Sequence, residues 1–194
     1  MNSTELKLNI IKKSPGIFIN TSEDSFCLNH KHVELLKNEI PVSPKGRSRI
    51  CVHKSNDELI HQMVIAMPHD HYVQAHKHTG KSESYQVIEG EAMFVEFDNQ
   101  ASIKLVYFLN AENCFLKTTI GQYHTLIVLS EFFVFMETTN GPFEESANFF
   151  APWAPSENEH EVIAKYKVDL KKNALSFSKN NGHNSNQSLK IKTP

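Results

Sequence analysis

The most informative segment of the chain reads His76-Lys77-His78-Thr79-Gly80-Lys81-Ser82-Glu83-Ser84-Tyr85-Gln86-Val87-Ile88-Glu89-Gly90. Two histidines lie two residues apart, and a glutamate follows the second histidine by five residues. Side chains alternate between the two faces of a strand, so His76 and His78 share a face and can chelate one ion. If the chain turns at residues 79–81 and comes back as a neighbouring strand, Glu83 adds a carboxylate ligand.

A histidine pair alone is a weak signal in this chain. With 11 histidines in 194 residues, chance gives roughly 0.6 His-x-His pairs, and the sequence has three. His30 and His32 lie in a segment with helical spacing, where residues two apart do not share a face, so we expect solvated surface there. His69 and His71 follow Pro68 at a predicted turn and lack a carboxylate or glycine at useful spacing. Only the third pair has suitable partners.

Composition limits the class of protein. A chain of 194 residues with 40% apolar content suffices for one domain with a sizeable core. The net charge of −2 does not indicate a nucleic-acid binder. Cys27, Cys51 and Cys114 form neither a CxxC motif nor an even-numbered disulfide framework, which fits a reducing compartment. The sequence shows no apolar leader and no run of membrane-spanning length. We therefore expect a soluble cytoplasmic protein without membrane insertion.

Three regions are predicted along the chain. Residues 1–46 form an arm with a short strand at Ile17–Ile19 and a helix at Asn29–Glu39. Residues 47–170 form a β-barrel domain. Residues 171–194 contain five lysines and no acidic residue, a composition typical of a disordered tail.

The barrel region contains many short segments rich in Val, Ile, Phe or Tyr and separated by turn signals. Regularly spaced short strands predict an antiparallel sandwich or barrel. The run Phe132–Met136 is apolar on both faces, so it is either a central buried strand or a dimer interface. Phe149–Pro155 either caps the barrel mouth or wraps the outside, and Val162–Leu170 alternates like a last edge strand. The other predicted strands are Gln62–Met67, His71–His76, Glu83–Glu89, Ala92–Asp98, Ser102–Leu109, Phe115–Ile120, His124–Ser130 and Phe132–Thr138.

A third imidazole is predicted to join the first two. His124 follows Gly121 by three residues and opens a strongly apolar strand. Its ring would face the barrel interior, where an unpaired polar group is costly. A hydrogen-bonded core histidine is the alternative, but the presence of the earlier motif favours a metal ligand.

The two histidine motifs resemble those of the cupin superfamily. His76, His78, Glu83 and Gly90 match the spacing of the first cupin motif, with Asp70 in place of its opening glycine. The second motif is kept at Gly121 and His124 only. Where it has glycine, proline and asparagine, this chain has Asn113, Thr119 and Val128.

A wider set of segments resembles the WbuC family of cupin-fold metalloproteins, across residues 16 to 157. These segments are Arg47-Ser48-Arg49, His53, Leu59–Met63, His76–Glu91, Tyr123–Glu131, Glu137–Phe143 and Phe150–Pro155. The resemblance implies a double-stranded β-helix, the cupin jelly-roll barrel, with a metal held by His76, His78, Glu83 and His124. It also implies a setting beside bacterial surface-polysaccharide (O-antigen) synthesis, and no substrate. Together with the two-faced apolar strand, it suggests a homodimer.

Such a ligand set leaves a divalent ion with a net charge of about +1 and one or two exchangeable positions. Fe would permit oxygen chemistry, whereas Mn, Ni or Zn would favour Lewis-acid polarisation. Glu137 is the candidate catalytic acid or base, or else a rim carboxylate. Arg49, His53, Gln62 and Tyr85 are candidates for the substrate pocket. Arg47 and Arg49 are either anion contacts or members of a rim ion pair.

Several functions fit these residues. The first is a metal-dependent isomerase, epimerase or dioxygenase acting on a sugar or nucleotide-linked sugar. The second is a non-catalytic, metal-dependent module that binds a sugar or small acid. An Fe(II)-dependent dioxygenase outside sugar metabolism and a metal-free cupin with catalytic histidines are further alternatives.

Overall fold

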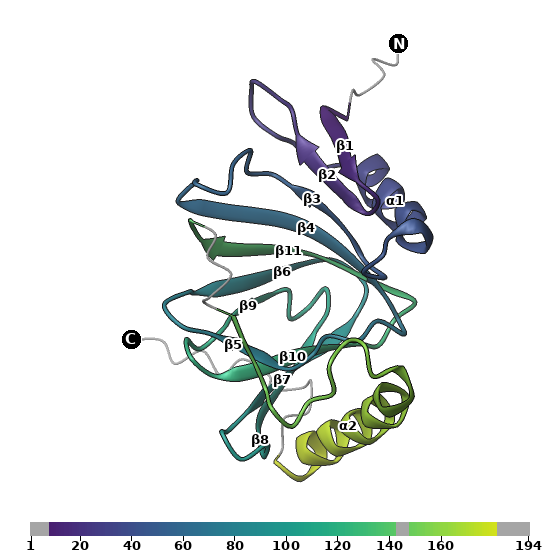
Figure 1. Ribbon diagram of the computed structural model, residues 1–194, viewed down its shortest axis with the longest axis vertical. Coiled ribbons are helices and arrows are strands. Elements are labelled where there is room, and N and C mark those ends of the chain that lie inside the picture. The colour runs from purple at the N-terminus through teal and green to yellow at the C-terminus, as the bar shows by residue number, and fades with distance from the viewer. Residues whose placement is uncertain (1–7, 143–147, 182–194) are drawn as a thin grey trace.

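The computed structural model describes residues 8–142 and 148–181. Its strands form two sheets, and a helix lies at each end of the molecule (Figure 1). The strand order is β1-β2-β3-β4-β11-β6-β9 in the first sheet and β12-β5-β10-β7-β8 in the second. The elements are β1 Ile10–Ser14, β2 Ile17–Asn20, α1 His30–Glu39, the short 3-10 helix Ile40–Val42, β3 Ser48–Cys51, β4 Ile60–Pro68, β5 His76–His78, β6 Glu83–Glu89, β7 Ala92–Phe97, β8 Ile103–Leu109, β9 Phe115–Lys117, β10 Tyr123–Val128, β11 Phe132–Asn140, β12 Asn148–Phe150 and α2 His160–Asn180.

The strand order identifies the fold. The successive strands β4 to β11 are shared between the sheets, as β4-β11-β6-β9 in one and β5-β10-β7-β8 in the other. Neighbours within each set pair antiparallel. This double-sheet winding is the jelly roll of cupins, so the predicted double-stranded β-helix is confirmed.

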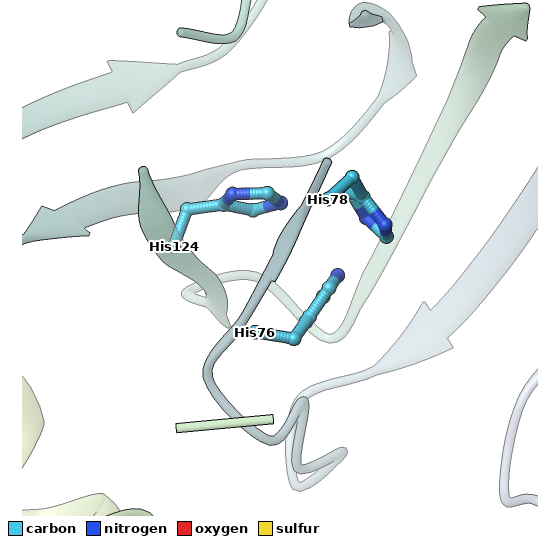
Figure 2. Close-up of side chains that lie close together, drawn as sticks. All are labelled: His76, His78 and His124. Atoms are coloured by element: carbon cyan, nitrogen blue, oxygen red, sulfur yellow. The ribbon is translucent and has the colours of Figure 1, made fainter. Parts of the chain in front are cut away.

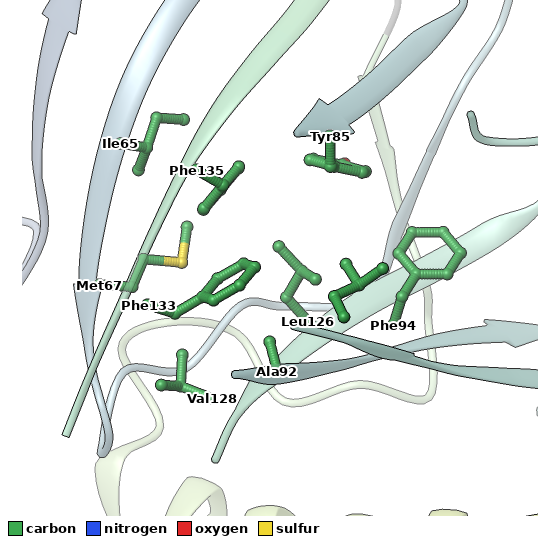
Figure 3. Packing of buried hydrophobic residues seen from close by; sticks show 10 residues of the cluster. Ile65, Met67, Tyr85, Ala92, Phe94, Leu126, Val128, Phe133 and Phe135 are labelled. Atoms are coloured by element: carbon green, nitrogen blue, oxygen red, sulfur yellow. The ribbon is translucent and has the colours of Figure 1, made fainter. Parts of the chain in front are cut away.

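The barrel interior is filled by side chains that alternate along the strands. On β11, Phe133 and Phe135 point inward and are fully buried, whereas Val134 points outward into a cluster with α1. Figure 3 shows the inner cluster between the two sheets. Because β11 lies between β4 and β6, the run Phe132–Met136 is a central strand covered on both faces within one chain. The inner cluster comprises Ile65, Met67, Tyr85, Ala92, Phe94, Leu109, Leu126, Val128, Phe133 and Phe135.

Helix α1 covers the outer face of the first sheet, and the prediction of a helix there is confirmed. Asn29 caps it, and His32 completes a capping box through its contact with the Asn29 backbone N–H. The other ring nitrogen of His32 lies 2.8 Å from the carbonyl of Leu8. The expectation of a solvated histidine pair is therefore wrong for His32, which is only 1% exposed. His30 is exposed, as expected.

Helix α2 covers the outer face of the second sheet (Figure 1). It replaces the edge strand predicted at Val162–Leu170, and it extends through Lys171–Asn180, the first part of the predicted disordered tail. Residues 182–194 of that tail lie outside the described residues. In the segment before α2, Ala151 and Ala154 pack with Ala174 against this outer face. Residues 151–155 thus pack on the outside of the barrel, whereas Phe149 and Phe150 belong to β12, which pairs with β5 at the edge of the second sheet.

Two other expectations are corrected near the site. Residues 71–75 of the predicted strand His71–His76 are irregular, and β9 ends at Lys117 rather than at residue 120. The remaining barrel strands lie within one or two residues of their predicted bounds. Within the described ranges, no helix combines the length and apolarity needed to span a bilayer.

Candidate metal centre

Three histidine side chains converge inside the barrel (Figure 2). His76 and His78 lie on β5, and His124 lies on β10 directly opposite His76 in the antiparallel pairing. One ring nitrogen from each histidine lies within 4.8 Å of the others. The period of two along a strand aims both β5 rings at the same side. The sequence-predicted trio is thus brought together.

Glu83 joins this cluster from the first residue of β6. Its carboxylate is buried, and its two oxygens contact two different imidazoles. Oε1 lies 3.0 Å from Nε2 of His78, and Oε2 lies 3.3 Å from Nε2 of His124. The Tyr85 hydroxyl donates to Oε2 over 3.2 Å. The contacts to the rings are not aligned as hydrogen bonds, so both Nε2 atoms remain buried without a hydrogen-bond partner.

The opposite nitrogen of each ring fixes its tautomer. Nδ1 of His76 lies 2.8 Å from the carbonyl of Gln74, and Nδ1 of His124 lies 3.0 Å from the carbonyl of Gln122. A carbonyl only accepts, so each Nδ1 must carry the proton and donate it. Nδ1 of His78 lies 2.7 Å from Oδ1 of Asn148 on β12, which fixes the third ring in the same way. All three Nε2 atoms then present lone pairs.

This arrangement sets acceptor against acceptor. The lone pairs of His78 and His124 face the oxygens of Glu83 at 3.0 and 3.3 Å, which is unfavourable unless a proton or a cation lies between them. Two ligand atoms about 2.1 Å from one ion lie roughly 3.0 Å apart at right angles and roughly 3.4 Å apart in a tetrahedron. The observed separations fall in this range. The donor set of imidazoles and carboxylate also suits a divalent transition metal.

Without a metal, protons must take this role. Burial disfavours the Glu83 carboxylate, but its contacts with His124 and His78 outweigh burial and hold its pKa well below the usual range. Burial likewise opposes the charged form of His78, yet the contact with Glu83 raises its pKa. Burial and the neighbouring His124 lower the pKa of His76 to about 4. His76 is therefore neutral and ready to donate a lone pair at physiological pH.

The cluster opens into a cavity of about 830 Å³. Arg49, His53 and Tyr85 line it, as expected for pocket residues, and Glu83 and His124 form part of its wall. Gln62 does not line it, so that prediction is wrong. Its side chain points to the opposite face of the sheet, toward Met136 and Thr138. The inward positions of β4 are the odd-numbered ones, including His61 and Met63.

Glu137 also lines the cavity, two strands from β3 and next to β6 in the sheet. Burial, and after it the charge of Glu83, raise its pKa to about 7. A carboxyl group in that range can both donate and accept a proton near neutral pH. Its position in the cavity suits the proposed acid or base role, which stays a prediction.

Asn148 and His61 are site residues that the sequence motifs did not indicate. Asn148 comes from a strand 70 residues away from His78, and no spacing rule links the two. His61 stacks on His53 with ring centroids 4.1 Å apart, at the cavity wall. Residues two apart on a strand share a face, so an inward-facing Met63 predicts an inward-facing His61. The pair His69 and His71 does not join the cluster.

Comparison with known proteins gives one partial family match. Residues 28–108 match the model of a domain of unknown function (DUF6016), and no curated protein matches the sequence.

Solved structures show limited likeness. The capsular polysaccharide assembling protein CapF from Staphylococcus aureus is 15% identical with a TM-score of 0.46, over 54% of this chain and 31% of CapF. Oxalate decarboxylase OxdC from Bacillus subtilis, as its R92A mutant, is 18% identical with a TM-score of 0.41, over 48% of this chain and 24% of that one. A conserved protein with a double-stranded β-helix domain from Klebsiella pneumoniae is 21% identical with a TM-score of 0.43, over 54% of this chain and 79% of that protein. This chain spans less than a third of the first two proteins.

Proposed function

We propose that this protein is a divalent-metal-binding cupin that acts on a sugar or nucleotide-linked sugar. One observation carries the metal site. The buried Nε2 atoms of His78 and His124 have no hydrogen-bond partner and face the oxygens of Glu83 at ligand-to-ligand separations. His76, His78, Glu83 and His124 would hold the ion. When bound, a metal of this kind polarises vicinal oxygens or, if it is Fe, supports oxygen chemistry.

The chain's own residues would orient the metal-binding side chains and move a proton. Asn148 and the carbonyls of Gln74 and Gln122 fix the imidazoles. Glu137 lies in the same cavity and would transfer a proton, which favours an isomerase or epimerase over a passive binder. The sugar assignment rests on the resemblance to the WbuC family. The homodimer and the cytoplasmic location likewise stay predictions.

Elemental analysis of protein purified without an affinity tag tests the metal site. We expect about one equivalent of Fe, Mn, Ni or Zn per chain, removed by a chelator and restored on reconstitution. Protein that holds no transition metal even after reconstitution would contradict the proposal and favour a metal-free cupin.

A panel of nucleotide sugars tests the reaction. Metal-loaded protein should convert at least one of them, detected by product analysis, and oxygen uptake separates oxidation from isomerisation. Saturable binding without turnover would instead identify a non-catalytic binding module. Oxygen uptake with a substrate that is not a sugar would identify a dioxygenase outside sugar metabolism.

A further inference from the structure

The cavity has a second set of charged side chains, Arg47 just before β3 and Arg49 on β3, in the sheet opposite the one that carries the three histidines. On β3 the side chains alternate: Ser48 donates to the carbonyl of Leu36 in α1, and Ile50 packs in the α1 cluster. Arg49 therefore points the other way, and both Arg47 and Arg49 line the cavity.

These two arginines have no contacting carboxylate among the described residues, and the charges of Glu157 and Glu137 act on Arg47 only from a longer distance. Among residues 8–142 and 148–181, no carboxylate lies within 4.0 Å of either guanidinium, in contrast to the ion pairs of Lys12, Lys37 and Lys45. The Nε atom of Arg49 is buried without a hydrogen-bond partner. The Arg47 guanidinium lies 3.4 Å from Nε2 of His71.

Burial makes this arrangement costly. It lowers the pKa of Arg47, but a guanidinium does not lose its proton in proteins, so the folded state bears the unfavourable charge. His71 is neutral, because burial and then the charge of Arg47 lower its pKa to about 4. A neutral His71 can accept from Arg47 and hold it in position without compensating its charge. An anion would supply a counter-charge in direct contact and bidentate hydrogen bonds.

The position of the pair relative to the histidine cluster limits the size of a shared ligand. In the first sheet, β3 is followed by β4, β11 and β6, so three strand spacings, or about 14 Å, separate the strands that carry Arg49 and Glu83. The strand pairing aligns Arg49 with Val87, so Glu83 also lies about 13 Å further along β6. The side chains reach inward from both positions, and the cavity of about 830 Å³ between them has room for a molecule of monosaccharide size with a charged substituent.

We propose that Arg47 and Arg49 form a subsite for an anionic group of the ligand, a carboxylate or a phosphate, while other ligand oxygens reach the histidine cluster. The ligand class is therefore a sugar acid or a sugar phosphate rather than a neutral sugar. His71 is a positioning residue that holds Arg47. The contact between ligand oxygens and the histidine cluster rests on the proposed function. The anion subsite does not, because the arginines would bind an anion with or without a metal.

Isothermal titration calorimetry of metal-loaded protein tests this subsite with inorganic phosphate, glucose 1-phosphate, glucuronate and glucose. Wild-type protein should bind glucuronate or glucose 1-phosphate at least about ten-fold more tightly than glucose, and the preferred one separates carboxylate from phosphate recognition. Arg49→Gln or Arg47→Gln should remove about ten-fold or more of the anion affinity, the usual effect of losing a charge-assisted hydrogen bond. The matched control is Lys165→Gln, on the exposed face of α2, which should change nothing.

Two results would overturn the subsite. One is anion affinity that is unchanged in both arginine variants. The other is wild-type protein that binds none of these anions at millimolar concentration. If Arg49→Gln does not fold, Arg49→Lys replaces it, since this variant keeps the charge but removes the planar guanidinium that binds an anion through two hydrogen bonds. The preference of the wild-type protein for anions over glucose then still tests the subsite. Metal content measured on the same samples separates the proposals. If the protein takes up no metal on reconstitution but still binds anions through Arg49, the subsite is supported and the proposed function is contradicted.

Discussion

The two ends of the barrel are built from the same strands but for opposite purposes. On β11, Phe133 and Phe135 fill one end and are fully buried. Further along the same strand and on the same face, Glu137 and Thr139 line the cavity. The apolar end contributes stability through burial, whereas the polar end buries His124 and Glu83 at a cost that only a proton or a cation can offset. The comparison indicates that stability and function come from adjoining parts of one core, which meet at Phe135 in the cavity wall.

The largest expected effect tests the apolar end. Phe133→Ala should lower the free energy of unfolding by about 3–5 kcal/mol, because it removes a buried ring and leaves a cavity. Urea unfolding measures the change, and Phe115→Ala, at a ring that is 63% exposed, should stay within about 0.5 kcal/mol. Metal stoichiometry in the remaining folded protein should be unchanged. Loss of the metal site in folded Phe133→Ala protein would show that the two ends are not independent.

The next effect tests the polar end. His124→Ala removes one of four proposed ligands and should weaken metal binding by more than about 100-fold, beyond the effect of losing a residue that only supports a ligand. Competition with a chromophoric chelator measures the affinity. His69→Ala, in a histidine pair outside the cluster, serves as the control. Equal affinities in the two variants would remove His124 from the ligand set.

A smaller effect is expected one step away from the ligands. Asn148→Ala leaves every proposed ligand in place but frees Nδ1 of His78, so the ring can rotate or change tautomer. Metal affinity should fall by about 10–100-fold, measured by the same competition. Asn158→Ala, at an exposed position, is the control. An unchanged affinity would mean that the strand backbone alone orients His78.

The smallest effect concerns the pH dependence of the chelator-treated protein. Because the pKa of Glu137 is raised to about 7 in the folded state, the folded protein binds more protons than the unfolded chain between about pH 4.5 and 7. Stability from this group is therefore lost as the pH rises through that window. Glu137→Gln should remove the slope and stabilise the protein above pH 7 by on the order of 1 kcal/mol. Unfolding curves at several pH values give the free energy of unfolding of both proteins. If this free energy depends on pH in the same way in wild type and in Glu137→Gln, Glu137 does not titrate in this window and the prediction is wrong.

The sequence predicted the central part of the molecule well, because local rules apply there. Alternation along β5 and β10 was enough to bring His76, His78 and His124 to one side, and Glu83 was placed by the turn that precedes β6. The proximity follows from strand pairing, which the hydrophobic pattern specifies. The role of these residues as ligands is a proposal that the geometry supports.

The predictions are wrong where the sequence fits both a strand period and a helix period, and incomplete where a contacting residue is distant in the sequence. Val162–Leu170 alternates like a strand, yet Ile163, Tyr166 and Leu170 also recur with helical spacing. In the helix Ile163 is buried, and Tyr166 and Leu170 are partly buried against the second sheet. Val168 of the alternating set is 67% exposed. The sequence does not fix the register of β4, so it predicts the wrong face for Gln62. Asn148 could not be foreseen, since no local pattern relates it to His78.

The hydrogen bonds to the Nδ1 atoms have a consequence for how such a site can evolve. In His76 and His124 the tautomer is set by main-chain carbonyls two residues earlier, which every amino acid supplies, so substitutions at Gln74 or Gln122 leave it intact. Only His78 depends on a side chain for its tautomer. Position 148 is thus the one place where a single codon change could retune the basicity of a ligand without losing it, and where natural variants with altered metal preference are to be sought.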